Sequence, residues 1–310
     1  DRRLRPGFRG RAGVPQIRRV SARPAVPTDP GAYAPADVRL VVADMDGTLL
    51  DDRKRFPGGL WRMLDQLDAR GVTFAPASGR QVWTLLDMFP DRPGMTVIGE
   101  NGAIVMRDGA EISSSPLDLP TLREAVRLVR AATGPGGVNG GLVMCGKRSA
   151  YVERVDEPFV AGVVPYYHRT RQVDSQLDVL DAIEAGELDD AIVKLAVHSL
   201  DPVGPLAEAT LARFRSTHQY AVSGANWADL QIRGVDKGRA VRALQGALGV
   251  TRAQTAVFGD FQNDLSMLAE ADLSFAVANA DPDVVRAARF VAPSNNEGGV
   301  VSVVERLFSL

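Results

Sequence analysis

Short apolar segments alternate with helix-forming segments along most of the chain after residue 36, and this alternation restricts the fold more than any other feature. Residues 38–43 form a mostly β-branched apolar run, and similar runs lie at 72–77, 96–98, 255–258, 274–278 and 289–292. Residues with helical spacing lie between these runs, at 60–67, 240–248 and 265–269, and after the last run, at 300–310. Short buried strands that alternate with helices predict an α/β fold with a parallel, doubly wound sheet. The ligands of such a sheet bind at the carboxyl ends of its strands.

Residues 106–231 interrupt this alternation. The interval contains helical spacing at 122–129 and 205–215, a Gly-Pro-Gly-Gly break after residue 133, and apolar runs at 142–145, 149–152, 192–197 and 229–232. The first two of these runs are close enough in sequence to form a hairpin. The mixture predicts an inserted α+β domain at 106–231, which divides the doubly wound core into residues 37–105 and 232–310.

The composition excludes several classes of protein. Apolar residues make up 45% of the 310 residues and charged residues 24%, as in ordinary globular proteins. No segment approaches the roughly 18 uncharged apolar residues of a membrane-spanning helix. The single cysteine, Cys145, rules out an intramolecular disulfide, lies among apolar residues as an inert core thiol does, and indicates a reducing compartment such as the cytoplasm. The formal net charge of −2 argues against a polyanionic partner.

Residues 1–36 differ from the rest of the chain. They contain eight arginines but only two aspartates, which gives a net charge of +6, and they are rich in proline and glycine. Because it lacks a sustained apolar period, this segment predicts a disordered basic extension. A targeting peptide and a nucleic-acid-binding arm are the alternatives. The segment has no apolar core of signal-peptide length, and we expect no nucleic-acid partner.

Two aspartates follow the first predicted strand directly, in the sequence Asp44-Met-Asp46-Gly-Thr48. Two carboxylates two residues apart at the end of a buried strand can both reach one ligand while the glycine lets the chain turn away. Carboxylate oxygens are ligands that Mg²⁺ prefers. One carboxylate can also attack phosphorus as a nucleophile while the other transfers protons. The simpler interpretation is an Asp/Gly turn that closes the strand.

Polar residues also follow the second predicted strand, in the sequence Ser78-Gly79-Arg80. They offer a hydroxyl group, a backbone N–H on a flexible residue and a guanidinium group. Together these groups can contact a phosphate, because each donates a hydrogen bond to an anionic oxygen. Serine and glycine after a strand are also typical of a simple turn, which is the alternative interpretation.

Two acids and an amide follow the run at 255–258, where Asp260, Asn263 and Asp264 lie at the start of a predicted helix. A helix N-terminus favours anions, although Asp260 can also be a simple N-cap. Lys237 begins the helix after the inserted segment and is one of only four lysines in the chain. Its ammonium group suits a phosphate oxygen or the transition state of phosphoryl transfer, and a solvated surface charge is the alternative.

Other polar residues carry less specific signals. Lys194 lies inside the apolar run 192–197, where a charge is costly unless it is paired, so we expect it to face outward from a half-exposed strand. The three histidines of the chain lack the spacing of a zinc site. The sequence Tyr166-Tyr167-His168 can line a pocket, but packing and surface roles fit it equally well.

Four motifs occur in one order along the chain, namely DMDGT at 44–48, ASGR at 77–80, KG at 237–238 and GDFQND at 259–264. This set resembles the haloacid-dehalogenase-like hydrolase superfamily, specifically the Cof-type phosphatases. The resemblance extends to the sequence ENGA at 100–103, and it implies a Rossmann-like core with an α+β cap inserted between the second and third motifs. Short cap sequences at 145–151, 166–168 and 223–224 are similar to the sugar-phosphate phosphatase branch.

The resemblance also implies roles for the motif residues. Asp44 is expected to be the nucleophile that forms an aspartyl-phosphate, and Asp46 to protonate the leaving alcohol and then to deprotonate the attacking water. The residues expected to contact the phosphoryl oxygens are Ser78, Gly79, Lys237 and Asn263. Mg²⁺ is expected to bind the Asp44 side chain, the Asp46 backbone carbonyl and the Asp260 carboxylate. The residues expected in supporting positions are Asp264, Thr48 and Arg80.

The prediction is therefore a Mg²⁺-dependent phosphatase of small phosphorylated metabolites, with sugar phosphates as the expected substrates. A phosphosugar mutase of the same superfamily is one alternative, because it would retain the phosphoryl group instead of releasing it to water. A catalytically silent phosphate-binding regulatory module is another. The sequence does not indicate the oligomeric state, the individual substrate or the cap residues that set specificity.

Overall fold

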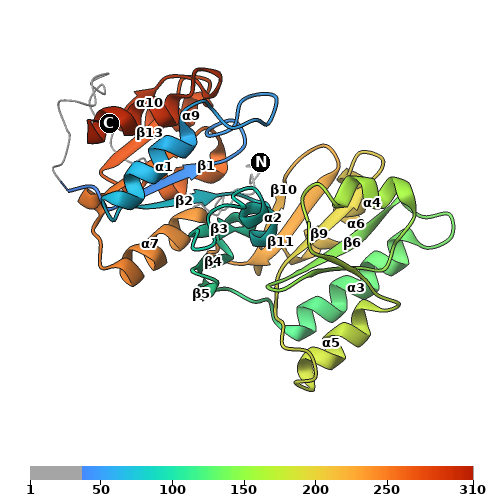
Figure 1. Ribbon diagram of the computed structural model, residues 1–310. Coiled ribbons are helices and arrows are strands. Elements are labelled where there is room, and N and C mark those ends of the chain that lie inside the picture. The colour runs from blue at the N-terminus through green and yellow to red at the C-terminus, as the bar shows by residue number, and fades with distance from the viewer. Residues whose placement is uncertain (1–36, 310) are drawn as a thin grey trace, which may run out of the picture.

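The computed structural model describes residues 37–309, which form two domains that lie side by side (Figure 1). The predicted basic extension at 1–36 lies outside the described residues. The core domain is built on an eight-stranded sheet, and the cap is built on a six-stranded sheet. Within residues 37–309, none of the helices combines the length and the hydropathy that a membrane span requires.

The core sheet has the strand order β14-β13-β12-β1-β2-β3-β4-β5. Its strands are β1 Leu40–Asp44, β2 Thr73–Ala77, β3 Val97–Gly99, β4 Ile104–Arg107, β5 Ala110–Ser114, β12 Thr255–Gly259, β13 Leu273–Val277 and β14 Phe290–Ala292. The six strands from β14 to β3 are parallel, whereas β4 and β5 are antiparallel additions at one edge. β1 lies between β2 and β12, so the carboxyl ends of the three strands that carry motifs are neighbours.

Helices cover both faces of the core sheet. One face carries α1 (Leu60–Ala69), α2 (Val82–Asp87) and α10 (Gly299–Phe308). The other carries α7 (Lys237–Leu248), α8 (Leu265–Leu268) and α9 (Pro282–Ala287).

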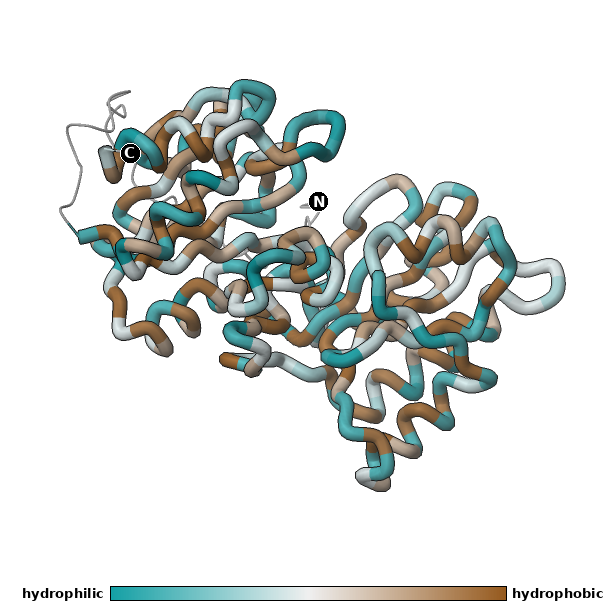
Figure 2. The backbone as a smooth tube through the Cα atoms, viewed as in Figure 1, coloured by the Kyte–Doolittle hydropathy of each residue, from teal (hydrophilic) through white to brown (hydrophobic). Residues whose placement is uncertain are grey.

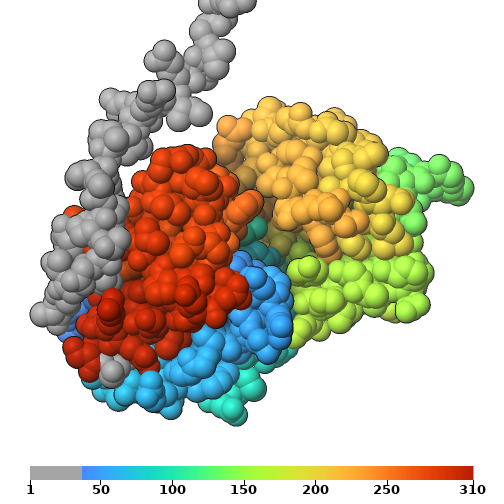
Figure 3. Space-filling model, turned by 90° about the horizontal axis from the view of Figure 1, so that it is seen from above, coloured from blue at the N-terminus to red at the C-terminus, as the bar shows by residue number. Residues whose placement is uncertain are grey.

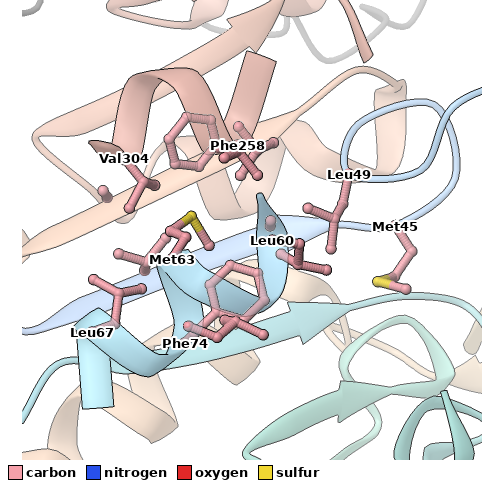
Figure 4. Packing of buried hydrophobic residues seen from close by; sticks show 14 of the residues in the cluster. Met45, Leu49, Leu60, Met63, Leu67, Phe74, Phe258 and Val304 are labelled. Carbon is pink, nitrogen blue, oxygen red and sulfur yellow. The ribbon is translucent and has the colours of Figure 1, made fainter. Parts of the chain in front are cut away.

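The two helical layers bury β1 from both sides. Val41 packs with the α1 layer and Val42 with the α7 layer. A strand buried on both faces has apolar residues at successive positions, which is why this one is a continuous apolar run. In the first layer, Leu60 and Met63 of α1 pack around Phe74 of β2 (Figure 4). In Figure 2, brown apolar segments alternate with teal polar segments along the chain in both domains.

The cap sheet has the strand order β10-β11-β9-β6-β7-β8. Its strands are β6 Gly140–Gly146, β7 Ala150–Val152, β8 Thr170–Gln172, β9 Ile192–Ser199, β10 His218–Val222 and β11 Trp227–Ile232. All neighbours are antiparallel except β7 and β8. One face is covered by α3 (Leu119–Thr133), α5 (Gln176–Glu184) and α6 (Gly204–Ala209), and α4 (Glu157–Val163) packs on the other face.

The structure confirms the doubly wound core with an inserted α+β cap, but one domain boundary and one helix differ from the prediction. Residues 106–114 were expected in the cap, yet β4 and β5 extend the core sheet to Ser114. β5 is mostly half-exposed, so it lacks the apolar run that marks the other core strands. The single helix predicted at 205–215 is divided into α6 and a 3₁₀ turn (Leu211–Phe214), because Thr210 leaves the helical conformation with φ −125° and ψ −89°.

Candidate active site

Asp44 is the last residue of β1 and lies buried at the carboxyl edge of the core sheet, with 6% of its surface accessible. The chain turns sharply after it, and the amide of Leu49 donates to the Asp44 carbonyl at 3.1 Å. Gly47 in this turn has φ 95°, and a Cβ atom there would lie 2.5 Å from Oδ2 of Asp260. Only glycine therefore fits, because it adopts the left-handed conformation freely and leaves room for Asp260.

Lys237 lies fully buried at the start of α7, between two carboxylates. Its Nζ forms ion pairs with Asp44 and with Asp264, the second at 2.7 Å. Burial acts to lower the pKa of Lys237, but the charges of Asp264 and Asp44 outweigh it and hold the pKa above the usual value. Lys237 is therefore a permanent cation inside the site and not a solvated surface charge.

Asp264 organises the loop that follows β12. Its Oδ2 accepts hydrogen bonds from the backbone N–H groups of Asp260 at 2.9 Å and Phe261 at 3.1 Å, while Oδ1 contacts Lys237. Asp260 does not cap a helix, which was the simpler interpretation of this motif. Its carboxylate instead accepts a hydrogen bond from Oγ1 of Thr48 at 2.7 Å, which ties the loop after β12 to the turn after β1.

Three carboxylates, those of Asp44, Asp260 and Asp264, each place an oxygen within 4.8 Å of the others. Burial raises the pKa of Asp44 well above its usual range, and the charge of Asp264 adds to this effect while Lys237 opposes it. Burial also raises the pKa of Asp260. One lysine does not balance three acids, so the cluster favours a further cation. Clustered carboxylate oxygens fit a hard divalent ion such as Mg²⁺.

Asp46 lies two residues after Asp44 and is held by two cations. Arg80 donates to it through Nε at 2.9 Å and Nη2 at 2.8 Å, and Lys54 forms an ion pair with it at 2.9 Å. Burial acts to raise the pKa of Asp46, but the hydrogen bonds from Arg80 and Lys54 outweigh it and lower the pKa. Arg80, which the sequence placed among possible phosphate contacts, therefore also controls the second motif carboxylate.

The loop after β2 is hydrogen-bonded to the tight turn at residues 100–103, which the sequence identified only as the motif ENGA. The carbonyl of Ser78 accepts a hydrogen bond from the amide of Asn101 at 2.9 Å. Asn101 adopts a left-handed conformation with φ 54°, which places its side chain over Gly79. Nδ2 of Asn263 donates to Oδ1 of Asn101 at 3.3 Å. The predicted phosphate contacts from two separate loops therefore lie together, with Asn101 as an additional member that was not predicted.

A cavity of about 430 Å³ lies between the core and the cap, where Figure 3 shows a hollow between the two domains. The core residues that line it are Asp44, Asp46, Ser78, Gly79, Arg80, Asn101, Asp260, Phe261 and Asn263. The cap residues that line it are Tyr166, Tyr167, Lys194, Ser223, Trp227 and Asp229. Most of the predicted site residues line this cavity because neighbouring parallel strands end at the same edge of a sheet. Lys237 lines an adjoining cavity and contacts Asp44 from there.

Lys194 does not face outward from a half-exposed strand, and that prediction is wrong. Its side chain is buried, forms an ion pair with Glu100 and donates a hydrogen bond to the carbonyl of Gly79 at 3.1 Å. Nζ also lies 5.3 Å from the ring centre of Tyr167. Lys194 belongs to the cap and Glu100 to the core, so its counter-charge comes from a distant part of the chain and leaves no local sequence signal.

Aromatic residues form part of the cap side of the cavity. Tyr166 packs edge-on against Trp227 at 5.7 Å between ring centres, and Trp227 stacks on His198 at 4.4 Å. His168 is not among the lining residues and instead contacts Asp87 at 2.9 Å. The predicted pocket role therefore holds for the tyrosines but not for the histidine next to them.

Comparisons with known proteins agree with this geometry. Residues 41–304 match the family described as haloacid dehalogenase-like hydrolase. A 5-amino-6-(5-phospho-D-ribitylamino)uracil phosphatase of Escherichia coli is 31% identical over 274 residues, which cover 87% of this chain and 96% of that protein. A phosphoglycolate phosphatase of Methanopyrus kandleri is 26% identical over 276 residues, which cover 86% and 96% of the two chains.

A solved structure shows the same fold. The crystal structure of a haloacid dehalogenase-like hydrolase from Bacteroides thetaiotaomicron matches with a TM-score of 0.73 at 21% identity, over 87% of this chain and all of that one. The family match spans both parts of the core and the cap between them. The chain therefore belongs to the haloacid dehalogenase-like hydrolases, as its four motifs predicted, and it is a phosphatase of that family.

Proposed function

We propose that this phosphatase hydrolyses small phosphorylated metabolites with Mg²⁺, through an aspartyl-phosphate on Asp44, and that its substrates are sugar or polyol phosphates. The observation that carries the proposal is the setting of Asp44, a buried carboxylate that lines the cavity and contacts a fully buried lysine. Phosphoryl transfer requires a nucleophile held in line with the phosphorus and cations that neutralise the phosphoryl oxygens. We assign the first role to Asp44 and the second to Lys237.

In the first half of the reaction, a carboxylate oxygen of Asp44 attacks phosphorus, and the bond between phosphorus and the ester oxygen breaks. Asp46 gives its proton to the departing oxygen, so that the product leaves as a neutral alcohol. In the second half, Asp46 takes a proton from a water molecule as that water attacks the aspartyl-phosphate. The acyl-phosphate bond to Asp44 breaks, inorganic phosphate leaves, and Asp46 regains its proton.

The other motif residues hold the phosphoryl group during both steps. We assign the contacts to its oxygens to the Ser78 hydroxyl group, the Gly79 N–H, Lys237 and Asn263. The Asp44 and Asp260 carboxylates and the Asp46 backbone carbonyl would hold Mg²⁺, which when bound neutralises negative charge on the phosphoryl oxygens. Thr48 and Asp264 keep Asp260 and the loop after β12 in position through their hydrogen bonds.

For Asp46 to act as an acid, its contact with Arg80 must weaken. In the paired arrangement, Arg80 and Lys54 hold Asp46 as a carboxylate with a lowered pKa, and such a group is a poor proton donor. We infer that the anionic phosphoryl group competes for Arg80 when substrate binds, which weakens its contact with Asp46. The pKa of Asp46 then rises toward the value that an acid catalyst needs.

The substrate class rests on two observations. The name of the Escherichia coli relative describes a phosphorylated ribityl chain, which is a phosphate ester of a polyol. The cavity of this protein combines the aromatic rings of Tyr166 and Trp227 with polar side chains on the cap, and binding sites for small polar metabolites combine these two kinds of surface.

The replacement Asp44→Asn tests the mechanism. We expect turnover of p-nitrophenyl phosphate with Mg²⁺ to fall by at least about 10³-fold, because the amide is a poor nucleophile and the aspartyl-phosphate cannot form. The matched control is Asp65→Asn, which makes the same change at an exposed residue of α1 and should leave turnover unchanged. Circular dichroism would verify that both variants are folded. Near-normal turnover of folded Asp44→Asn would refute the assignment.

The same preparation separates a phosphatase from a mutase. Release of inorganic phosphate, measured with a panel of phosphorylated sugars and polyols and without a bisphosphate activator, is expected for the hydrolase. Conversion of one sugar phosphate isomer into another, with no phosphate release, would instead identify a mutase.

A further inference from the structure

Five acidic side chains are buried in the described part of the chain, namely Asp44, Glu100, Asp190, Asp229 and Asp264. Four of them have an ionic or hydrogen-bonding partner, which is Lys237 for Asp44 and Asp264, Lys194 for Glu100, and the Tyr151 hydroxyl group for Asp190. The carboxylate of Asp229 receives no hydrogen bond or ion pair from residues 37–309, although only 8% of the residue is accessible. The Asp229 oxygens are not among the fully buried side-chain atoms that lack a partner, so the accessible part of this residue includes its carboxylate, which is open to a ligand in the cavity that it lines.

The strand β11 directs Asp229 toward the active site. Alternate residues of a strand point to opposite faces, and Ala228 and Leu230 belong to the apolar layer of the cap under α3. Trp227 and Asp229 point the other way and line the catalytic cavity. Gln231 continues this face and donates a hydrogen bond to the carbonyl of Glu100 at 2.7 Å, which fixes the end of β11 against the core.

Asp229 lies where two cavities meet. It lines both the catalytic cavity of about 430 Å³ and an adjoining cavity of about 510 Å³, and Ser223 of the cap lines both as well. The phosphoryl-binding residues occupy the core side of the first cavity, so a substrate bound there extends its leaving group toward the cap. Asp229 is therefore a buried carboxylate that faces the space available to the leaving group.

The charge of Asp229 is not compensated locally. Burial acts to lower the pKa of Lys194, on the adjacent strand β9, but the charges of Glu100, Tyr167 and then Asp229 outweigh it and raise the pKa. That lysine, however, already forms an ion pair with Glu100 and a hydrogen bond with the Gly79 carbonyl. Among the charged cap residues that line the cavity, Lys194 is already held by Glu100 of the core, so Asp229 is the one left without an ion-pair partner within residues 37–309. A leaving group that donates hydrogen bonds would be a partner for the Asp229 carboxylate, whereas the carboxylate would repel a second anionic group.

We propose that Asp229 sets the specificity of this phosphatase, by selecting leaving groups that present hydroxyl or amino donors and by rejecting leaving groups that carry a carboxylate or a second phosphate. This inference rests on the proposed function, since it assumes that a phosphate monoester binds with its phosphoryl group at Asp44. The proposal distinguishes two substrate classes that occur in the names of the relatives, because a ribityl chain offers hydroxyl groups as hydrogen-bond donors whereas glycolate carries a carboxylate.

Matched substrate pairs test the proposal. Glucitol 6-phosphate and 6-phosphogluconate differ in the oxidation state of the terminal carbon, hydroxymethyl against carboxylate, as do glycerol 3-phosphate and 3-phosphoglycerate. In at least one of these two pairs, we expect the parent enzyme to prefer the hydroxymethyl ester over the carboxylate by about 50-fold or more in kcat/KM. The replacement Asp229→Asn keeps the size of the side chain but removes its charge, and should reduce that preference at least 10-fold. Turnover of p-nitrophenyl phosphate, measured in parallel, shows whether the variant retains a working phosphoryl site.

Controls make the outcomes distinct. Asp174→Asn, the same change at an exposed cap residue, should leave the preference as in the parent enzyme. Asp229→Ser provides a second neutral variant in case the first is unstable. An unchanged preference in a folded Asp229 variant would overturn the proposal, and so would an equal loss of activity toward all substrates, which indicates a structural role. Neither result would affect the assignment of Asp44, because only Asp44→Asn tests the nucleophile.

Discussion

The ion pair between Lys194 and Glu100 joins the cap to the core, and its removal should destabilise the protein in a measurable way. The two side chains are 3% and 1% accessible, and Oε1 of Glu100 has no hydrogen-bond partner within residues 37–309. The replacement Lys194→Met keeps most of the length and volume of the side chain but removes the charge. Glu100 is then left buried with no counter-charge, which is the costly situation for an ionised group.

The magnitude follows from burial. Removal of one partner from a buried ion pair costs about 3–5 kcal/mol in the free energy of unfolding. We expect about 3 kcal/mol for Lys194→Met, at the lower end of that range, because burial already raises the pKa of Glu100 and lets it take up a proton. Glu100→Gln should lower the free energy of unfolding by about 2 kcal/mol, because Lys194 retains its hydrogen bond to the Gly79 carbonyl. The double variant should also cost about 2 kcal/mol, which gives a coupling of about 3 kcal/mol.

The pH dependence of Lys194→Met gives an independent check. The folded protein holds the pKa of Glu100 above the usual value near 4.5, so between these two pKa values the unfolded chain binds fewer protons. Stability therefore falls as pH rises through this interval. The deficit of Lys194→Met should be smaller at pH 5.5 than at pH 8, whereas the deficit of the double variant, which lacks both charges, should not change.

Urea unfolding provides the assay, followed by tryptophan fluorescence and by far-ultraviolet circular dichroism. Coincident transitions would justify a single free energy of unfolding for the two domains, and unchanged m-values would show that the same surface is exposed. The reasoning would be refuted if Lys194→Met cost less than about 1 kcal/mol, or if the costs of the single variants added in the double variant. Either result would mean that water, and not Lys194, compensates Glu100.

Three further predictions follow from other parts of the structure. A chelator should abolish turnover of p-nitrophenyl phosphate, and added Mg²⁺ should restore it without a change in circular dichroism; turnover that persists in the chelator would contradict the metal assignment. Burial lowers the pKa of His198, so as pH falls below about 6.5 the unfolded chain is protonated before the folded protein. The free energy of unfolding then decreases by up to about 1.4 kcal/mol for each unit that the pH falls. The His198→Phe variant should lack this part of the loss in urea unfolding between pH 7.5 and 5.5, and an identical pH profile would exclude the effect. Burial raises the pKa of the Cys145 thiol, so iodoacetamide should label Cys145 only after unfolding, as mass spectrometry would show; rapid labelling of the folded protein would indicate an accessible thiol.

The residues at the carboxyl edge of the core sheet were predictable because their positions depend on local patterns. A continuous apolar run that ends in Asp44 indicates a strand buried on both faces, and the same holds for the strand before Asp260. Once the alternation with helices indicates a parallel sheet, the ends of these strands must lie along one edge. Distant acidic motifs therefore meet without any knowledge of loop conformations.

The cap side of the cavity was not predictable in the same way. Whether Lys194 is exposed or buried depends on Glu100, which another domain supplies, and β11 carries Asp229 and Leu230 to opposite faces of its sheet. Sequence periodicity shows that a strand has two faces, but not which face a second domain covers. The sequence by itself determined the fold class and identified the groups that we assign to phosphate binding. Only the tertiary structure decided which cap side chains line the cavity, because that depends on how two separately patterned domains pack together.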